Sequence, residues 1–168
     1  MNPTILFSTA RCALGLVLVA KNERGVCAIL LGDNPRRLER DLAACFPDAP
    51  VRQAGTELEL LLAKVVSSID QPGHGLELTL DPQGTAFQQR VWHALRQIPE
   101  GATETYGEVA ARIGAPGAAK EIGEACAANI LALAIPCHRV VRKDGGLAGY
   151  RWGVRRKRAL LELEKGQP

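Results

Sequence analysis

The chain has 168 residues, of which 46% are hydrophobic, and its formal net charge is +3. A chain of this length and apolar content can bury a core of its own, which argues against disorder. Its longest apolar runs are far shorter than a bilayer span, and residues 1–10 lack the pattern of a secretory signal. We therefore expect a cytoplasmic protein with no membrane partner.

The cysteines are odd in number and include no Cys-x-x-Cys pair, which argues against a disulfide framework and a zinc finger. None of the three histidines stands at metal-ligand spacing from another ligand, so we expect neither a metal site nor a cofactor. Most of the cysteines should be small core residues in a reducing compartment. The five are Cys12, Cys27, Cys45, Cys126 and Cys137.

Positive charge gathers in the second half of the chain. Residues 1–84 carry 8 Lys and Arg against 10 Asp and Glu, whereas residues 85–168 carry 13 against 8. A basic cluster of this kind suits a phosphate-binding surface, although an ordinary solvated helix face explains it equally well. The clustered residues are Arg139, Arg142, Lys143, Arg151, Arg155, Arg156, Lys157 and Arg158.

The first half begins with a strand pattern. Residues 14–20 and 26–31 are apolar runs joined by a polar segment, which predicts a β-hairpin. Asn34 is a favourable N-cap residue, and Pro35 suits the first turn of a helix. Apolar residues then recur at helical spacing until Pro47, so we expect a helix over this interval.

A second helix is predicted by the capping-box pair Thr56 and Glu59 and by apolar residues that recur every three or four positions up to Ile69. Residues 76–80 are a candidate strand, and residues 81–84 are a candidate linker. This half contains no cluster of polar groups that is typical of chemistry. We expect it to have a packing and positioning role.

Helix signals dominate the second half. Thr85 with Gln88 forms a capping-box pattern before a helix that should end by Pro99. Thr105 with Glu108 repeats the pattern before a shorter helix. Two helices in close succession, each with its own N-terminal signal, predict a mostly helical lobe.

The shorter helix, residues 106–113, is followed by a Gly-Pro turn at residues 114–117 and by a further helix over residues 118–128. This order predicts a helix-turn-helix. The last helix is rich in small residues, which permit either close approach to a nucleic-acid groove or tight packing within the protein. They are Gly123, Ala125, Ala127 and Ala128.

Cys137 stands between apolar runs. Residues 130–135 are apolar, Pro136 restricts the backbone, and His138 follows the cysteine. A thiol becomes an effective nucleophile when a base or a positive field favours its thiolate. Neighbouring residues on a strand face opposite sides, so a Cys–His contact requires an irregular turn or a bridging water. An inert buried cysteine is the competing interpretation.

Glu164 lies near the end of the last predicted helix, residues 153–165, three and four residues after two inward-facing leucines. An acid on a buried face needs a partner, and His138 is the candidate. A carboxylate that binds one imidazole nitrogen leaves the other free to act as a base. The competing interpretation is a frayed helix end with Glu164 in solvent.

Residues 135–141, Ile-Pro-Cys-His-Arg-Val-Val, resemble the active-site motif of the O6-alkylguanine-DNA alkyltransferases, and the similarity extends from Arg11 to Glu164. Residues 87–92 and 149–153 are similar to the Ada branch of that family, as is the segment Ala-Cys-Ala-Ala-Asn that ends at Asn129. The motif is highly specific.

The resemblance implies an α+β fold with two lobes. A small N-terminal α/β lobe of the RNase H-like type, residues 1–82, would have a structural role. A mostly helical lobe with the helix-turn-helix, residues 83–168, would bind DNA and accept the alkyl group.

The resemblance also implies the roles of individual residues. Cys137 would attack the alkyl carbon, with His138, a water and Glu164 as the relay that generates thiolate. Tyr106 would supply a proton to the departing guanine, and Asn129 would brace the active-site turn. Each molecule would act once, on O6-alkylguanine or, as an extension, on O4-alkylthymine. The implied substrate pocket consists of Val140, Tyr150, Arg151 and Trp152.

The implied partner is alkylated double-stranded DNA, bound by a monomer through its minor groove. The target nucleotide must leave the base stack to reach a recessed thiol. The family places the second helix of the helix-turn-helix in the groove. The implied DNA-binding residues are Ala119, Lys120, Glu121, Gly123, Glu124, Ala127 and Arg139.

The chain departs from its family on that helix. Lys120 replaces the arginine that fills the space of the extruded base, and Glu121 and Glu124 should repel phosphates. We therefore expect weaker duplex binding. A paralogue or engineered variant that acts on small alkylated molecules is the alternative. A binding-only relative would lack Cys137, and a cysteine hydrolase would turn over.

Overall fold

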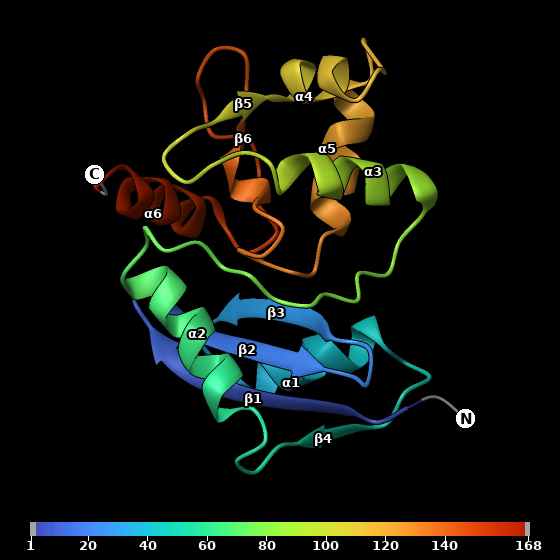
Figure 1. Cartoon of the computed structure of the whole chain (residues 1–168), viewed down its shortest axis with the longest axis vertical. Coiled ribbons are helices and arrows are strands. Elements are labelled where there is room, and N and C mark those ends of the chain that lie inside the picture. The colour runs from blue at the N-terminus through green and yellow to red at the C-terminus, as the bar shows by residue number, and fades with distance from the viewer. Residues whose placement is uncertain (1–2, 167–168) are drawn as a thin grey trace. The chain divides into compact units, whose positions relative to one another are not determined.

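The computed structural model describes residues 3–166, in which helices and strands form a mixed α/β structure (Figure 1). The chain divides into two units, Met1–Pro82 and Gln83–Pro168. Each unit has its own helices and strands, so each is described in turn. None of the helices formed by the described residues has the length and apolar character needed to cross a bilayer.

Four strands of the first unit form one sheet: β1 (Ile5–Cys12), β2 (Gly15–Lys21), β3 (Val26–Gly32) and β4 (Val51–Gln53). Their order is β3-β2-β1-β4, with antiparallel pairs except for β4, which runs parallel to β1. The predicted hairpin is confirmed as β2 and β3, whose apolar runs are almost wholly buried. The sequence analysis did not predict β1 and β4.

The first helix, α1 (Pro35–Cys45), begins where its sequence predicts. The Asn34 side chain accepts a hydrogen bond from the Arg37 backbone N–H at 3.1 Å, and Pro35 occupies the first turn. Leu38 and Leu42 are buried and pack this helix toward β3. The N-cap prediction is therefore confirmed.

The second helix, α2 (Glu59–Asp70), begins later than predicted, and the capping box at Thr56 is wrong. The neighbouring Glu57 carboxylate accepts the Gly55 N–H at 2.6 Å and pairs with Arg52 at 3.1 Å. These contacts hold the preceding residues in a turn, and Leu58 becomes the N-cap residue without a side-chain cap.

Residues 76–80 do not form the predicted strand. Leu80 makes an isolated bridge to Val26, whose backbone N–H donates to Thr79 O at 2.9 Å and whose carbonyl accepts the Asp81 N–H at 2.8 Å. The segment is tied to the edge of β3 at this one point, so an extended chain is present without a continuous ladder.

Within residues 83–166, the second unit contains four α-helices, two short parallel strands and a 3₁₀ turn: α3 (Ala86–Leu95), β5 (Glu104–Thr105), α4 (Tyr106–Arg112), α5 (Ala119–Ala128), η1 (Cys137–Arg139), β6 (Val140–Val141) and α6 (Val154–Lys165). Both predicted capping boxes are present. Thr85 Oγ1 accepts the Gln88 N–H and Thr105 Oγ1 accepts the Glu108 N–H, each at 3.1 Å.

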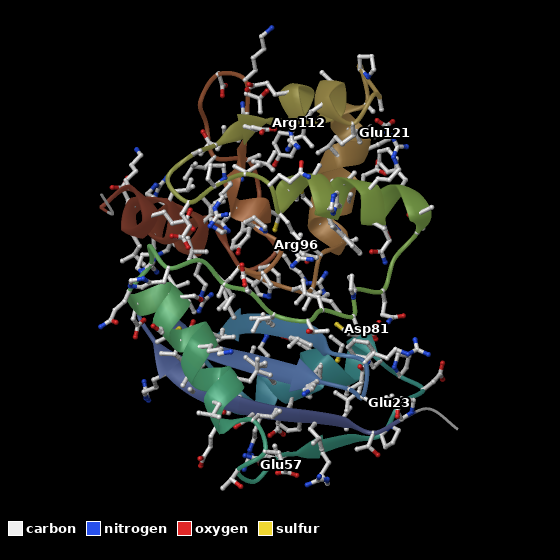
Figure 2. The ribbon with its side chains drawn as sticks, viewed as in Figure 1. Glu23, Glu57, Asp81, Arg96, Arg112 and Glu121 are labelled. Atoms are coloured by element: carbon white, nitrogen blue, oxygen red, sulfur yellow. The ribbon has the colours of Figure 1, made fainter. Side chains whose placement is uncertain are left out.

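Packing in this unit converges on η1. Helices α3, α4 and α5 pack against one another, and both α3 and α6 contact η1. Arg112 ties α4 to its neighbours, because its guanidinium donates to Glu104 at 3.1 Å and to the Ala94 carbonyl at 2.8 Å (Figure 2). The pairing of β5 with β6 fixes the chain directly after η1.

The contribution of the α3 capping box to stability can be tested by mutation. Thr85→Ala removes the acceptor of the Gln88 N–H, and we expect it to lower the free energy of unfolding by about 1 kcal/mol. Both tryptophans of the chain lie in the second unit, so tryptophan fluorescence during urea unfolding reports on this unit. Thr103→Ala is the control, since Thr103 caps no helix. Equal midpoints for the two variants would contradict the prediction.

Candidate active site

Cys137 opens η1 and is 4% exposed. The amide of Asn129, the residue that ends α5, donates to Cys137 Sγ at 3.3 Å and to the Ile135 carbonyl at 2.9 Å. The Asn129 side-chain oxygen accepts the Leu131 N–H at 2.8 Å. One buried amide therefore holds the sulfur and both ends of the loop that precedes it, as expected for a residue that braces the turn.

The loop itself turns sharply at Leu133, whose φ of 71° lies in the left-handed region that side chains other than glycine seldom adopt. The turn is closed by backbone hydrogen bonds from Ala134 to Ala132 at 2.7 Å and from Ile135 to Leu131 at 3.0 Å. Strained backbone of this kind persists only where its surroundings hold it in place.

The predicted contact between His138 and Glu164 is confirmed. His138 Nε2 lies 2.9 Å from Glu164 Oε2, and the two residues are 1% and 7% exposed. Glu164 is therefore buried and paired, and the alternative of a solvated helix end is wrong. The contact joins α6 to η1 across the base of the site.

Arg139 is a second partner of the same carboxylate. Its Nε and Nη2 donate to Glu164 at 3.0 and 2.7 Å, and its Nη1 donates to the Ile98 carbonyl at 2.7 Å. The side chain is 10% exposed. Arg139 was predicted to bind DNA, and the structure places its guanidinium in buried contacts within the protein.

The protonation states follow from these contacts. Burial alone would raise the pKa of Glu164, but the hydrogen bonds from His138 and Arg139 outweigh it and lower the pKa to about 2. Burial lowers the pKa of His138 more than the carboxylate raises it, so the imidazole is neutral. Its Nε2–H then donates to Glu164, and Nδ1 carries the lone pair. Nδ1 is buried and has no hydrogen-bond partner within residues 3–166.

Burial also raises the pKa of the Cys137 thiol to about 11, although the Asn129 hydrogen bond and the positive charges of Lys157 and Arg151 oppose the rise. The resting group at neutral pH is therefore a thiol. Lys157 was predicted to belong to an exposed basic cluster. Its side chain is instead fully buried, with Nζ 3.4 Å from the Ala148 carbonyl.

The thiol faces a cavity of about 640 Å³. Tyr106, Tyr150 and Arg151 line it, as expected for site residues. Burial raises the pKa of Tyr106 to about 12, so its hydroxyl is protonated at neutral pH. Four of the residues of α5 that were expected to meet DNA also line the cavity: Ala119, Lys120, Gly123 and Ala127.

Two predicted pocket residues do not line this cavity, and three that do line it were missed: Cys126, Ala148 and Gly149. Val140 is fully buried in β6, and Trp152 is buried with its ring centroid 5.2 Å from that of Tyr150 in an edge-on arrangement. Cys126, which was expected to be a core thiol, lines the cavity beside Cys137. Its position on the same face of α5 as Gly123 and Ala127 is the signal that could have found it.

Glu121 and Glu124 are exposed on α5 and lie outside the cavity lining (Figure 2 labels Glu121). They face solvent where a partner of α5 would approach. Within residues 3–166, no group of three or more His, Cys, Asp and Glu side chains could hold a metal ion.

A thiol, a neutral imidazole and the carboxylate that orients it define a class of protein that forms a covalent bond at cysteine. Residues 86–166 match the family model described as "6-O-methylguanine DNA methyltransferase, DNA binding domain". The chain is also 36% identical over 151 residues to a methylated-DNA–protein-cysteine methyltransferase of Methanosarcina acetivorans, covering 90% of this chain and 92% of that protein. It belongs to the O6-methylguanine-DNA methyltransferase family, as its motif predicted.

Two further similarities extend over most of the chain. It is 50% identical over 163 residues to the bifunctional transcriptional activator/DNA repair enzyme Ada of Escherichia coli, covering 97% of this chain and 46% of that protein. The chain thus spans about half the length of the first curated relatives it matches. The crystal structure of Mycobacterium tuberculosis OGT in complex with DNA matches with a TM-score of 0.81 and 34% identity, covering 95% of this chain and 92% of that one.

The paired carboxylate predicts a pH dependence. The pKa of Glu164 is about 2 in the folded protein and near 4.5 when unperturbed, so folding is favoured above 4.5 and the contribution is lost as the pH falls toward 2. Glu164→Gln should abolish this loss of folding stability at acidic pH. It should also lower the free energy of unfolding at pH 7 by about 3 kcal/mol, because the buried charge of Arg139 is left without its carboxylate partner.

Urea unfolding of both proteins at neutral and acidic pH, followed by tryptophan fluorescence, measures the effect. Glu162→Gln is the matched control on the same helix, since Glu162 is exposed. If wild type and Glu164→Gln lose stability in parallel as the pH falls, the carboxylate does not have the assigned role.

Proposed function

We propose that this chain repairs DNA by direct reversal, transferring an alkyl group from O6-alkylguanine onto its own Cys137. The observation that carries the proposal is the buried thiol, held by Asn129 at 3.3 Å, next to a neutral imidazole that Glu164 orients at 2.9 Å. The relatives named for methyl transfer from DNA to a protein cysteine support the same reaction.

The proposed reaction begins with loss of the thiol proton. His138 Nδ1 accepts it through a bridging water, and the carboxylate of Glu164 stabilises the resulting imidazolium. The Asn129 amide and the ammonium group of Lys157 favour the thiolate, because both oppose the effect of burial on its pKa. The thiolate forms only when the relay removes its proton, which keeps the resting site neutral.

The thiolate then displaces guanine from the alkyl carbon. A sulfur–carbon bond forms as the carbon–oxygen bond breaks, and the electron pair leaves on the purine. The Tyr106 hydroxyl, which faces the cavity, supplies the proton that the leaving group takes up.

The product is a thioether, which is chemically stable. No group in the cavity offers a route for removing the alkyl substituent from sulfur, so each molecule reacts once. The substrate set comprises O6-alkylguanine and, by the same displacement at an exocyclic oxygen, O4-alkylthymine.

For DNA binding, α4, the turn after it and α5 act as a helix-turn-helix of a monomer, with α5 in the minor groove. The small residues Ala119, Gly123 and Ala127 line the cavity on the face of α5 that would approach the groove. The target nucleotide swings out of the stack into the cavity at a cost of a few kcal/mol. The first unit is a supporting lobe of the RNase H-like type.

Intact mass measurement tests the reaction. Incubation with a duplex that contains O6-methylguanine should add one methyl group to the wild-type chain, located on the Cys137 peptide, and then stop. Cys137→Ser should gain none, whereas Cys12→Ser, altered far along the chain in β1, should react normally. Methyl removal by Cys137→Ser at the wild-type rate would sink the proposal, and repeated turnover on an ester would favour a hydrolase.

The acidic residues of α5 give a second test. Glu121→Ala and Glu124→Ala each remove a negative charge from the proposed DNA-facing helix, so we expect duplex binding to tighten by up to about fivefold at low salt. The gain should shrink as salt increases. Fluorescence anisotropy with a labelled duplex measures the dissociation constant, and Glu162→Ala on α6 is the control. Unchanged affinity in both α5 variants would show that these carboxylates do not face DNA.

A further inference from the structure

Cys126 is a cavity residue that the proposed reaction does not use. It lies on α5 and lines the same cavity as Cys137, so two cysteines border one mostly apolar space. A second thiol at this position has no role as nucleophile or proton donor in alkyl transfer. Alkyl transfer therefore does not account for the presence of this thiol in the cavity.

Asn129 connects the two cysteines. Its backbone N–H donates to the Cys126 carbonyl at 3.2 Å, while its side-chain amide donates to Cys137 Sγ at 3.3 Å. The end of α5 is anchored as well, because Trp92 Nε1 donates to the Ala125 carbonyl at 2.9 Å. The backbone of Cys126 and the sulfur of Cys137 thus both bind one buried residue, through hydrogen bonds that do not depend on a substrate.

The electrostatics of the thiols agree with this proximity. Burial raises the pKa of Cys126, and the negative charge that Cys137 would carry as thiolate raises it further. Lys157 interacts with both sulfurs. At neutral pH both groups are therefore protonated, and a ligand that leaves the pair neutral suits this mostly apolar cavity better than one that requires two buried thiolates.

The two cysteines offer two sulfur donors, and this number limits which metal or metalloid species they can bind. Zinc takes four ligands, and the described residues contain no group of three or more metal-binding side chains. Trivalent arsenic that carries an organic group needs only two sulfur donors. An aryl group on the arsenic would find the rings of Tyr106 and Tyr150 in the lining.

We propose that Cys126 and Cys137 together form a dithiol site for trivalent aryl arsenicals. An arylarsine oxide reacts with both thiols: two arsenic–sulfur bonds form, two S–H bonds break, and the oxide oxygen leaves as water with the two protons. Arsenic remains trivalent, so no oxidant or reductant takes part. The further consequence, that the occupied site cannot accept an alkyl group, rests on the proposed function.

Phenylarsine oxide is the probe. Wild-type protein should bind one equivalent by intact mass, retain it in excess 2-mercaptoethanol, and release it to 1,2-ethanedithiol, since a dithiol competes for both bonds at once. Cys126→Ser and Cys137→Ser should each weaken binding by roughly a hundredfold, because the second bond is no longer intramolecular. Cys12→Ser should bind as the wild type does.

Retention of the arsenical by Cys126→Ser in excess monothiol would overturn the site, as would peptide mapping that places it on other cysteines. Cys126→Ala serves if the serine variant fails to fold by circular dichroism. In the wild type, the bound arsenical should also shield both cysteines from N-ethylmaleimide, and labelling of Cys126 in the complex would count against the proposal.

Methyl transfer from O6-methylguanine DNA, measured on the same preparation, separates this proposal from the proposed function. Arsenical binding without methyl transfer leaves the dithiol site in place and overturns the repair reaction. If the protein accepts the methyl group but does not retain the arsenical in excess monothiol, the repair reaction stands and the dithiol site is overturned.

Discussion

The second unit depends on a buried carboxylate. Glu164 comes from α6, and its two oxygens receive hydrogen bonds from His138 and Arg139 of η1, while Arg139 also reaches the carbonyl of Ile98 just beyond α3. Removing a carboxylate from water is costly, and it is tolerated here because a bidentate guanidinium and an imidazole together satisfy it. The same contact selects the imidazole tautomer, so the packing of α6 and the basicity of His138 Nδ1 cannot be altered independently.

The sequence predicted local structure well wherever that structure depends on a few neighbouring residues. The caps at Asn34, Thr85 and Thr105 follow from side chains that reach the backbone three residues away. Thr56 failed because Glu57, a residue outside the capping pattern, forms the competing contacts. Strand β4 was missed because it is short and pairs in parallel with β1 across a long stretch of chain. Strand β1 pairs locally with β2, but Ser8, Thr9 and Arg11 interrupt its apolar run, and it was missed for that reason.

The site was predictable in its reactive centre and unpredictable in its surroundings. The motif around Cys137 and the helical position of Glu164 were enough to place the thiol, the imidazole and the carboxylate together. The number of charged residues in a segment of sequence does not reveal how deeply each side chain is buried. Arg139 and Lys157, which are buried, were therefore grouped with surface residues. Cys126 was overlooked because a thiol in an alanine-rich helix looks like a core residue unless the cavity beside it is known.

The left-handed backbone at Leu133 bears on how such a protein is used. Together with Asn129, this turn holds the Cys137 sulfur in place, and in the proposed reaction it would fix the direction of attack on carbon before DNA is bound. An enzyme with many cycles must relax to expel its product and reset. A protein that reacts only once has no such requirement. A rigid backbone at its nucleophile therefore does not slow the reaction, and the turn can keep one conformation permanently.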